Sequence, residues 1–124
     1  MSTERQFIAA KGLAMGSGFL DESAADTLTA YATGGQANGT PITASLARFT
    51  AVATAGDSAL MMPSSAGRAV TVINAHASNA MNVFPAVGES FNALAANTAI
   101  SIPATKVMTF FCTSPGLWHT QVGA

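Results

Sequence analysis

The chain has 124 residues, of which 49% are apolar and only 9% are charged, with five Lys or Arg, six Asp or Glu and a net charge of −1. Roughly a quarter of the residues in an ordinary soluble domain are charged, so this composition predicts a surface largely hidden against other protein. The basic residues are scattered, which argues against the concentrated cationic footprint that nucleic acids and anionic membranes require.

Residues 1–40 are predicted to form an extended N-terminal arm. They hold six of the 11 glycines and four of the six acidic residues, and too few large apolar side chains for a core of their own. Within the arm, Glu4–Lys11 predicts one or two helical turns, and the alternation over Thr27–Thr33 predicts a strand. The glycine- and asparagine-rich segment 34–39 is typical of a tight turn.

Residues 41–124 are predicted to form one all-β domain, an antiparallel β-sandwich or jelly-roll-like barrel. Turn signals recur about every 8–12 residues, which is typical of these folds. No helical pattern of about 10–15 residues lies between the strands, which disfavours a parallel sheet built from βαβ units. The predicted strands are Phe49–Thr54, Ser58–Met62, Ala69–Asn74, Ala80–Phe84, Ser90–Asn92, Thr98–Ile102, Val107–Cys112 and Leu117–Val122.

Four apolar side chains on these strands are predicted to anchor the core, namely Val72, Phe84, Phe110 and Trp118. Cys112 is the only cysteine and lies in an apolar segment, so we expect a buried small side chain. A single cysteine forms neither an intrachain disulfide nor a thiolate metal cluster. No apolar stretch approaches the ~18 residues of a membrane span. The first residues also lack the charge order of a signal peptide, which predicts synthesis in the cytosol.

Residues that often carry catalysis or bind metals are present but form no recognisable motif. His76 and His119 lack further ligands at metal-site spacing, although a symmetric trimer could bring copies of one histidine together on an axis. No nucleophile elbow, phosphate loop or dinucleotide glycine pattern occurs. A glycosidase would have to draw its carboxylate pair from Asp21, Glu22, Asp26, Asp57 and Glu89. These residues lie in the arm or in turns, so we expect them to be surface carboxylates. We therefore expect that the protein is not an enzyme and that it binds no metal and no cofactor.

Between Gly39 and His119 the chain carries a set of turn and core motifs. They read Asn38-Gly-Thr-Pro-Ile-Thr, Ala51-Val-Ala-Thr-Ala-Gly-Asp, Leu60-Met-Met-Pro, Val70-Thr-Val-Ile-Asn-Ala, Asn82-Val-Phe-Pro-Ala, Asn92-Ala-Leu-Ala-Ala-Asn and Gly116-Leu-Trp-His. This set resembles a small β-rich module of tailed-bacteriophage virion proteins, which occurs in head-decoration (cement) proteins and in fibre or spike proteins. The resemblance implies an all-β, trimer-forming unit on a virus particle and carries over no active site.

An arm joined to one module looks more like a decoration protein than like a fibre with a shaft. We therefore expect a homotrimer that binds the major capsid protein on the surface of the assembled head, without nucleic acid or membrane partners. Capsid contacts are expected from the apolar residues of the arm, which are Phe7, Ile8, Leu13, Met15, Phe19, Leu20 and Leu28. The alternatives are a tail, collar or fibre-tip module that binds a receptor or adaptor and, as a remote third, a small enzyme acting on glycans.

Overall fold

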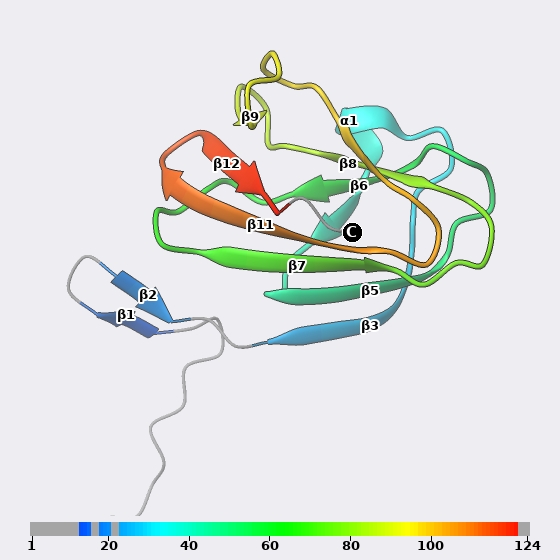
Figure 1. The fold of residues 1–124 in the computed structure, drawn as a ribbon, viewed down its shortest axis with the longest axis horizontal. Coiled ribbons are helices and arrows are strands. Elements are labelled where there is room, and N and C mark those ends of the chain that lie inside the picture. The colour runs from blue at the N-terminus through cyan, green and yellow to red at the C-terminus, as the bar shows by residue number, and fades with distance from the viewer. Residues whose placement is uncertain (1–12, 16–17, 21–22, 122–124) are drawn as a thin grey trace, which may run out of the picture.

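The computed structural model describes residues 13–15, 18–20 and 23–121, and almost all of its regular structure is β-strand (Figure 1). The elements are β1 (Leu13–Met15), β2 (Gly18–Leu20), β3 (Ala24–Thr29), α1 (Gly35–Asn38), β4 (Thr40–Ile42), β5 (Leu46–Ala51), β6 (Asp57–Met61), β7 (Ala69–Asn74), β8 (Met81–Phe84), β9 (Ser90–Phe91), β10 (Ile100–Ile102), β11 (Val107–Ser114) and β12 (Leu117–Thr120). The predicted all-β class is confirmed. In the described ranges no helix has the length and apolar character needed to cross a bilayer.

Two sheets form the body of the molecule. One has four strands in the order β10-β8-β6-β4, and the other has six in the order β3-β5-β7-β11-β12-β9. From β3 to β8 the chain alternates between the two sheets, so each sheet gains one strand per turn of the chain (Figure 1). Successive strands in a sheet are therefore parallel, as register pairs such as Ala47 with Val72 and Ala59 with Val83 show. This winding is solenoid-like.

The sheets are mixed, so the predicted antiparallel pairing is wrong for much of the body. Antiparallel pairs join β10 to β8, and β11 to both β7 and β12. Each of these pairs involves a strand that follows β8, after the solenoid-like part of the chain. Parallel neighbours need a crossover connection, which is usually a helix. Here the chain passes through a strand of the opposite sheet between two parallel neighbours, and this strand takes the place of the helix. Short strands and frequent turns are therefore compatible with both kinds of pairing.

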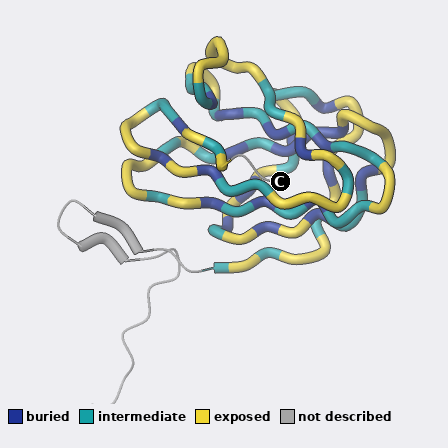
Figure 2. Tube along the Cα trace, in the orientation of Figure 1, coloured by how far each residue is buried: buried dark blue, intermediate teal, exposed yellow. Residues whose placement is uncertain are grey.

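The core lies between the two sheets, and it follows the alternation of side chains along each strand (Figure 2). Val72, Phe110 and Trp118, three of the four predicted anchors, are at most 1% exposed. The rings of Phe91 and Phe110 pack with centroids 5.1 Å apart and a 50° tilt, a favourable offset arrangement for two aromatic rings. Cys112 is also buried, as expected.

Phe84, the fourth predicted anchor, lies outside this core. On β8 the buried residues are Met81 and Val83, whereas Asn82 and Phe84 are half-buried. Successive side chains of a strand point to opposite faces, so Val83 occupies the inward position that the prediction assigned to Phe84. The prediction followed side-chain size and ignored the alternation along the strand.

The body begins well before the predicted boundary at residue 40. β3 is a strand of the six-stranded sheet, and Leu28 packs against the core although it was assigned to the arm. The predicted turn 34–39 contains the helical turn α1. A Cβ on Gly39 would come within 2.9 Å of the Ala59 backbone, and one on Gly34 within 2.9 Å of the Ser58 hydroxyl oxygen. These glycines therefore allow close packing onto β6.

The remaining residues of the predicted arm lie before Ser23. Phe7, Ile8 and the predicted helical turn Glu4–Lys11 are outside the described residues. Leu13 and Met15 lie on β1, and Phe19 and Leu20 lie on β2, two strands that pair antiparallel. Figure 1 shows this hairpin beside the body, close to the start of β3.

Candidate functional site

Asp57 and Glu89, the two candidate catalytic carboxylates of the body, both accept hydrogen bonds from the protein itself. Asp57 is 1% exposed, and its Oδ2 accepts from the Thr54 backbone N–H at 3.0 Å. Glu89 Oε2 accepts from the backbone N–H and the hydroxyl of Ser64, at 3.1 and 3.0 Å. Glu89 Oε1 accepts from Trp118 Nε1 at 3.3 Å. This geometry assigns both carboxylates a structural role.

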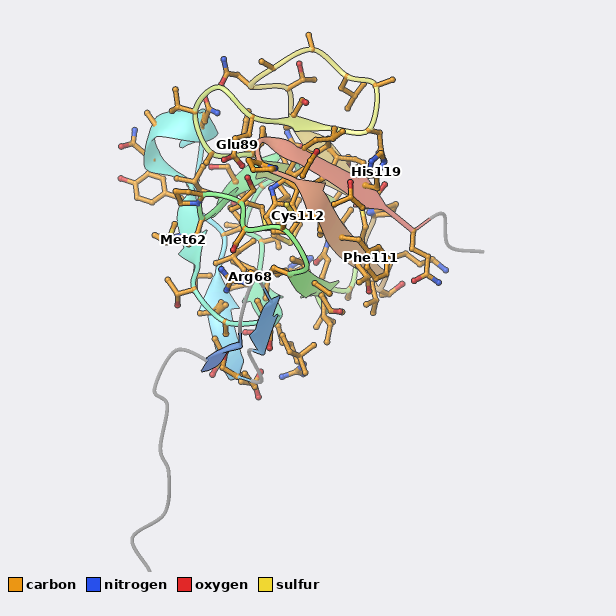
Figure 3. All side chains as sticks on the ribbon, turned by 90° about the vertical axis from the view of Figure 1, so that its left-hand side faces the viewer. Met62, Arg68, Glu89, Phe111, Cys112 and His119 are labelled. Atoms are coloured by element: carbon orange, nitrogen blue, oxygen red, sulfur yellow. The ribbon has the colours of Figure 1, made fainter. Side chains whose placement is uncertain are left out.

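Glu89 and Ser64 tie three separate segments together. Ser64 follows β6, Glu89 precedes β9, and the Gly116 backbone N–H between β11 and β12 donates to the Ser64 hydroxyl at 2.7 Å. Figure 3 shows Glu89 apart from Phe111 and His119. The network fixes turns at one end of the two sheets.

Of the other candidate carboxylates, Asp21 and Glu22 lie outside the described residues, and Asp26 forms an ion pair. Asp26 Oδ1 lies 2.8 Å from Arg48 Nη1, and both side chains are substantially exposed. The hydrogen bond from Arg48 lowers the pKa of Asp26 below its ordinary value of 3.8, and the Thr27 backbone N–H contributes in the same direction. This pair ties β3 to β5 at the outside of the six-stranded sheet.

Replacing Asp26 with Asn is expected to lower stability slightly at neutral pH and hardly at all in acid. Because the folded-state pKa is lowered, the pair stabilises the protein above about pH 3.8 and loses this contribution as the pH falls through the folded-state value. The effect is small because the pair is exposed. Urea unfolding midpoints of both proteins at neutral and acidic pH test this. High salt should shrink the neutral-pH difference, and a constant difference at every pH would contradict the assignment.

The two histidines have different environments. His76 Nδ1 accepts from the backbone N–H groups of Ser78 and Asn79, at 3.2 and 3.0 Å, so this nitrogen holds the turn between β7 and β8. His119 is exposed on β12, opposite Phe111 on β11. Among the residues that the structure describes, no three His, Cys, Asp or Glu side chains are grouped as a metal site would need.

Buried asparagine is the main polar feature that sequence reasoning missed. The Asn74 side chain is fully buried, and its Nδ2 donates to the carbonyls of Asn79, Ile102 and Pro103, at 2.9, 3.0 and 3.3 Å. Its Oδ1 accepts from the His76 backbone N–H at 3.1 Å. An asparagine ending a β-branched strand and entering a turn was the available signal, because this amide readily pairs with backbone groups.

The outward-facing side chains of the six-stranded sheet form a second feature, here named the outer sheet face. Burial alternates along β11, so Phe110 is buried whereas Phe111 is 42% exposed. Figure 3 shows Phe111 and His119 on the side away from the four-stranded sheet, and Cys112 further inside. Strand register arranges the face as three rows: Arg48-Ile73-Val107, Leu46-Thr71-Thr109 and Ala69-Phe111-His119.

Residues 85–98, here named the 85–98 loop, present a third surface. Val87 is 82% exposed and Leu94 is 42% exposed. Asn97 Oδ1 accepts from the Gly88 backbone N–H at 2.7 Å and from Gln36 Nε2 at 3.1 Å. Gln36 also donates to the Pro85 carbonyl at 2.8 Å. Asn97 and the α1 residue Gln36 thus hold the loop in place, whereas Val87 and Leu94 remain exposed on its outside.

The outer edges of both sheets are poorly suited to pairing with another strand. β3 shifts register twice along β5, and its Thr27 has a φ of 53°. β4 contains Pro41, which has no N–H to donate. β10 has three residues before Pro103, and β9 has two. Bulges, prolines and short lengths are the usual means by which edge strands avoid adding a further strand.

No family model, no curated protein and no solved structure matches this chain.

Proposed function

We propose that this protein is a capsid decoration protein that binds the assembled head of a tailed bacteriophage and stabilises it through contacts between subunits. The observation that carries the proposal is an all-β body that has few charges and exposes apolar side chains on two separate surfaces. Its mechanism is burial of surface, at roughly 25 cal/mol per Å² of apolar area. A protein that binds only the assembled shell shifts the assembly equilibrium toward the intact head.

We propose that residues before residue 23 contact the capsid shell and that the body contacts other copies of this chain. The apolar residues proposed to contact the major capsid protein are Phe7, Ile8, Leu13, Met15, Phe19 and Leu20. Leu28 is left out of this set, because it packs against the core of the body. Any truncation meant to remove the arm must stop before β3, since a cut at residue 40 would remove a strand of the six-stranded sheet.

Full-length protein added to heads that lack it is expected to sediment with them and to raise the temperature at which they break open. A Phe7→Asp, Phe19→Asp double variant is expected to lose binding, because two charges on an apolar contact cost their desolvation. Thr105→Asp, which adds one charge in an exposed turn of the body, serves as the control. Wild-type protein that fails to sediment with heads would overturn the proposal.

The exposed 85–98 loop, which hydrogen bonds from Asn97 and Gln36 hold in place, favours a second candidate, a tail, collar or fibre-tip module with a receptor- or adaptor-binding role. Rigid scaffolds commonly present binding residues on such loops. Copy number separates the two candidates. A decoration protein is present in amounts comparable to the major capsid protein, whereas a tail or vertex component is present in few copies. Quantitative mass spectrometry of purified particles measures this ratio.

A further inference from the structure

We infer that the outer sheet face is the surface through which copies of this chain meet. Three of its members are among the large apolar side chains most exposed to solvent: Val107 at 54%, Phe111 at 42% and Leu46 at 41%. Each belongs to a different row of the face: Leu46 lies on β5, whereas Val107 and Phe111 lie on β11, on the other side of β7. The inference deepens the proposed function, since it names the self-contact that an assembling decoration protein would use.

Three polar side chains on this face, Thr71, Thr109 and Arg48, are already paired, which lowers the cost of removing them from water. The hydroxyl oxygens of Thr71 and Thr109 lie 3.0 Å apart and share a hydrogen bond. Arg48 is neutralised by Asp26 at 2.8 Å. A buried polar group is costly chiefly when it loses its partner, and here the partners lie on the same face.

The scarcity of charge on the outer sheet face indicates that its partner is a second copy of this chain. Arg48 is the only formally charged residue among the nine that define the face, and its compensating carboxylate is adjacent. A strongly acidic or basic partner would find no opposite charge here, whereas another neutral face is complementary. In a closed symmetric assembly the chain itself supplies such a face.

Because the edges of the sheets are poorly suited to strand addition, copies are expected to associate through this face. β3 is bulged, β4 contains a proline, and β9 and β10 have two and three residues. Strand addition along the described edges is therefore disfavoured. Face-to-face packing of sheets through interdigitated apolar side chains is the remaining common way in which β-sheets associate.

The test measures the oligomeric state of the full-length chain by sedimentation velocity over a wide range of protein concentrations. Wild-type protein should assemble, and Phe111→Asp should raise the dissociation constant of the assembly about 30-fold or more, as loss of a central aromatic contact does. Val87→Asp is the matched control, because it places the same charge on a more exposed apolar site in the 85–98 loop. This control should assemble like the wild type.

Val107→Lys provides a second, independent variant on the face, and it should also weaken assembly. Circular dichroism and thermal unfolding at low concentration show whether each variant keeps the fold. A monomeric wild type, or folded Phe111→Asp and Val107→Lys variants that assemble normally, would overturn the inference. The assay needs no virus particle, so this failure is separate from failure to bind heads.

Discussion

Replacing Asn74 with Ala is expected to lower the free energy of unfolding by about 3 kcal/mol or more, because buried hydrogen-bonding groups that lose a partner each cost about 1–3 kcal/mol. The amide donates to the carbonyls of Asn79, Ile102 and Pro103 and accepts from His76, in a fully buried position. One side chain thus joins the end of β7 to the following turn and to the end of β10. Its removal leaves groups of the turn after β7 and of the end of β10 unpaired.

Asn74→Asp should be still more destabilising at neutral pH, although it keeps the shape of the side chain. A carboxylate cannot donate to the three carbonyls, and a buried charge without a partner is costly. Urea unfolding measures both variants, with an unchanged slope indicating that the loss is one of stability. Asn38→Ala, at an exposed position of α1, is the control and should change stability little. An Asp variant as stable as the wild type would refute the assigned amide orientation.

The positions of most strands could be predicted from local sequence. The predicted strand Ala69–Asn74 coincides with β7, because β-branched residues fill it and turn residues border it. The pairing of strands could not be predicted, since the partners of β7 lie on β5 and β11, far away in sequence. A turn marks where a strand ends and does not say whether the chain reverses in the same sheet or crosses to the other.

The polar networks were missed for a similar reason. Asparagine and glycine were interpreted as turn residues, which is correct for the backbone but leaves the partners of the side chain undetermined. Asn92 shows a related gap: it ends the predicted strand Ser90–Asn92, yet it has a φ of 53°, and its side chain bonds to the hydroxyl and backbone N–H of Thr120 on β12. Likewise, Glu89 was interpreted as a surface carboxylate, because nothing local indicates that Ser64 and Trp118 lie beside it.

The sequence predicts that a hidden surface such as the outer sheet face exists, but it does not predict where on the molecule this surface lies. Scarcity of charge predicts hidden surface somewhere on the molecule, and alternation along β11 separates Phe110 from Phe111. Which side faces the core depends on the neighbouring sheet. Only the register of β5, β7, β11 and β12 brings Leu46, Val107 and Phe111 onto one surface.

Replacing Trp118 with Ala is expected to lower the free energy of unfolding by about 3–5 kcal/mol, the usual cost of removing a large aromatic side chain from a core. Trp118 is 1% exposed and is the largest of the fully buried side chains in the described chain. It lies on β12 between β11 and β9. The loss should therefore loosen the end of the sheet that Glu89 and Ser64 hold together.

Trp118→Phe separates packing from hydrogen bonding at the same site. The ring of Phe fills part of the space but cannot donate to Glu89 Oε1, so a cost of about 1–3 kcal/mol is expected from the unpaired carboxylate and the smaller ring. If the Trp118–Glu89 contact matters, the effects of Trp118→Phe and Glu89→Gln should be less than additive in the double variant. Ser101→Ala, at an exposed position of β10, is the control and should lie within about 0.5 kcal/mol of the wild type. Strict additivity of the two effects would show that Glu89 stabilises this end through Ser64 alone.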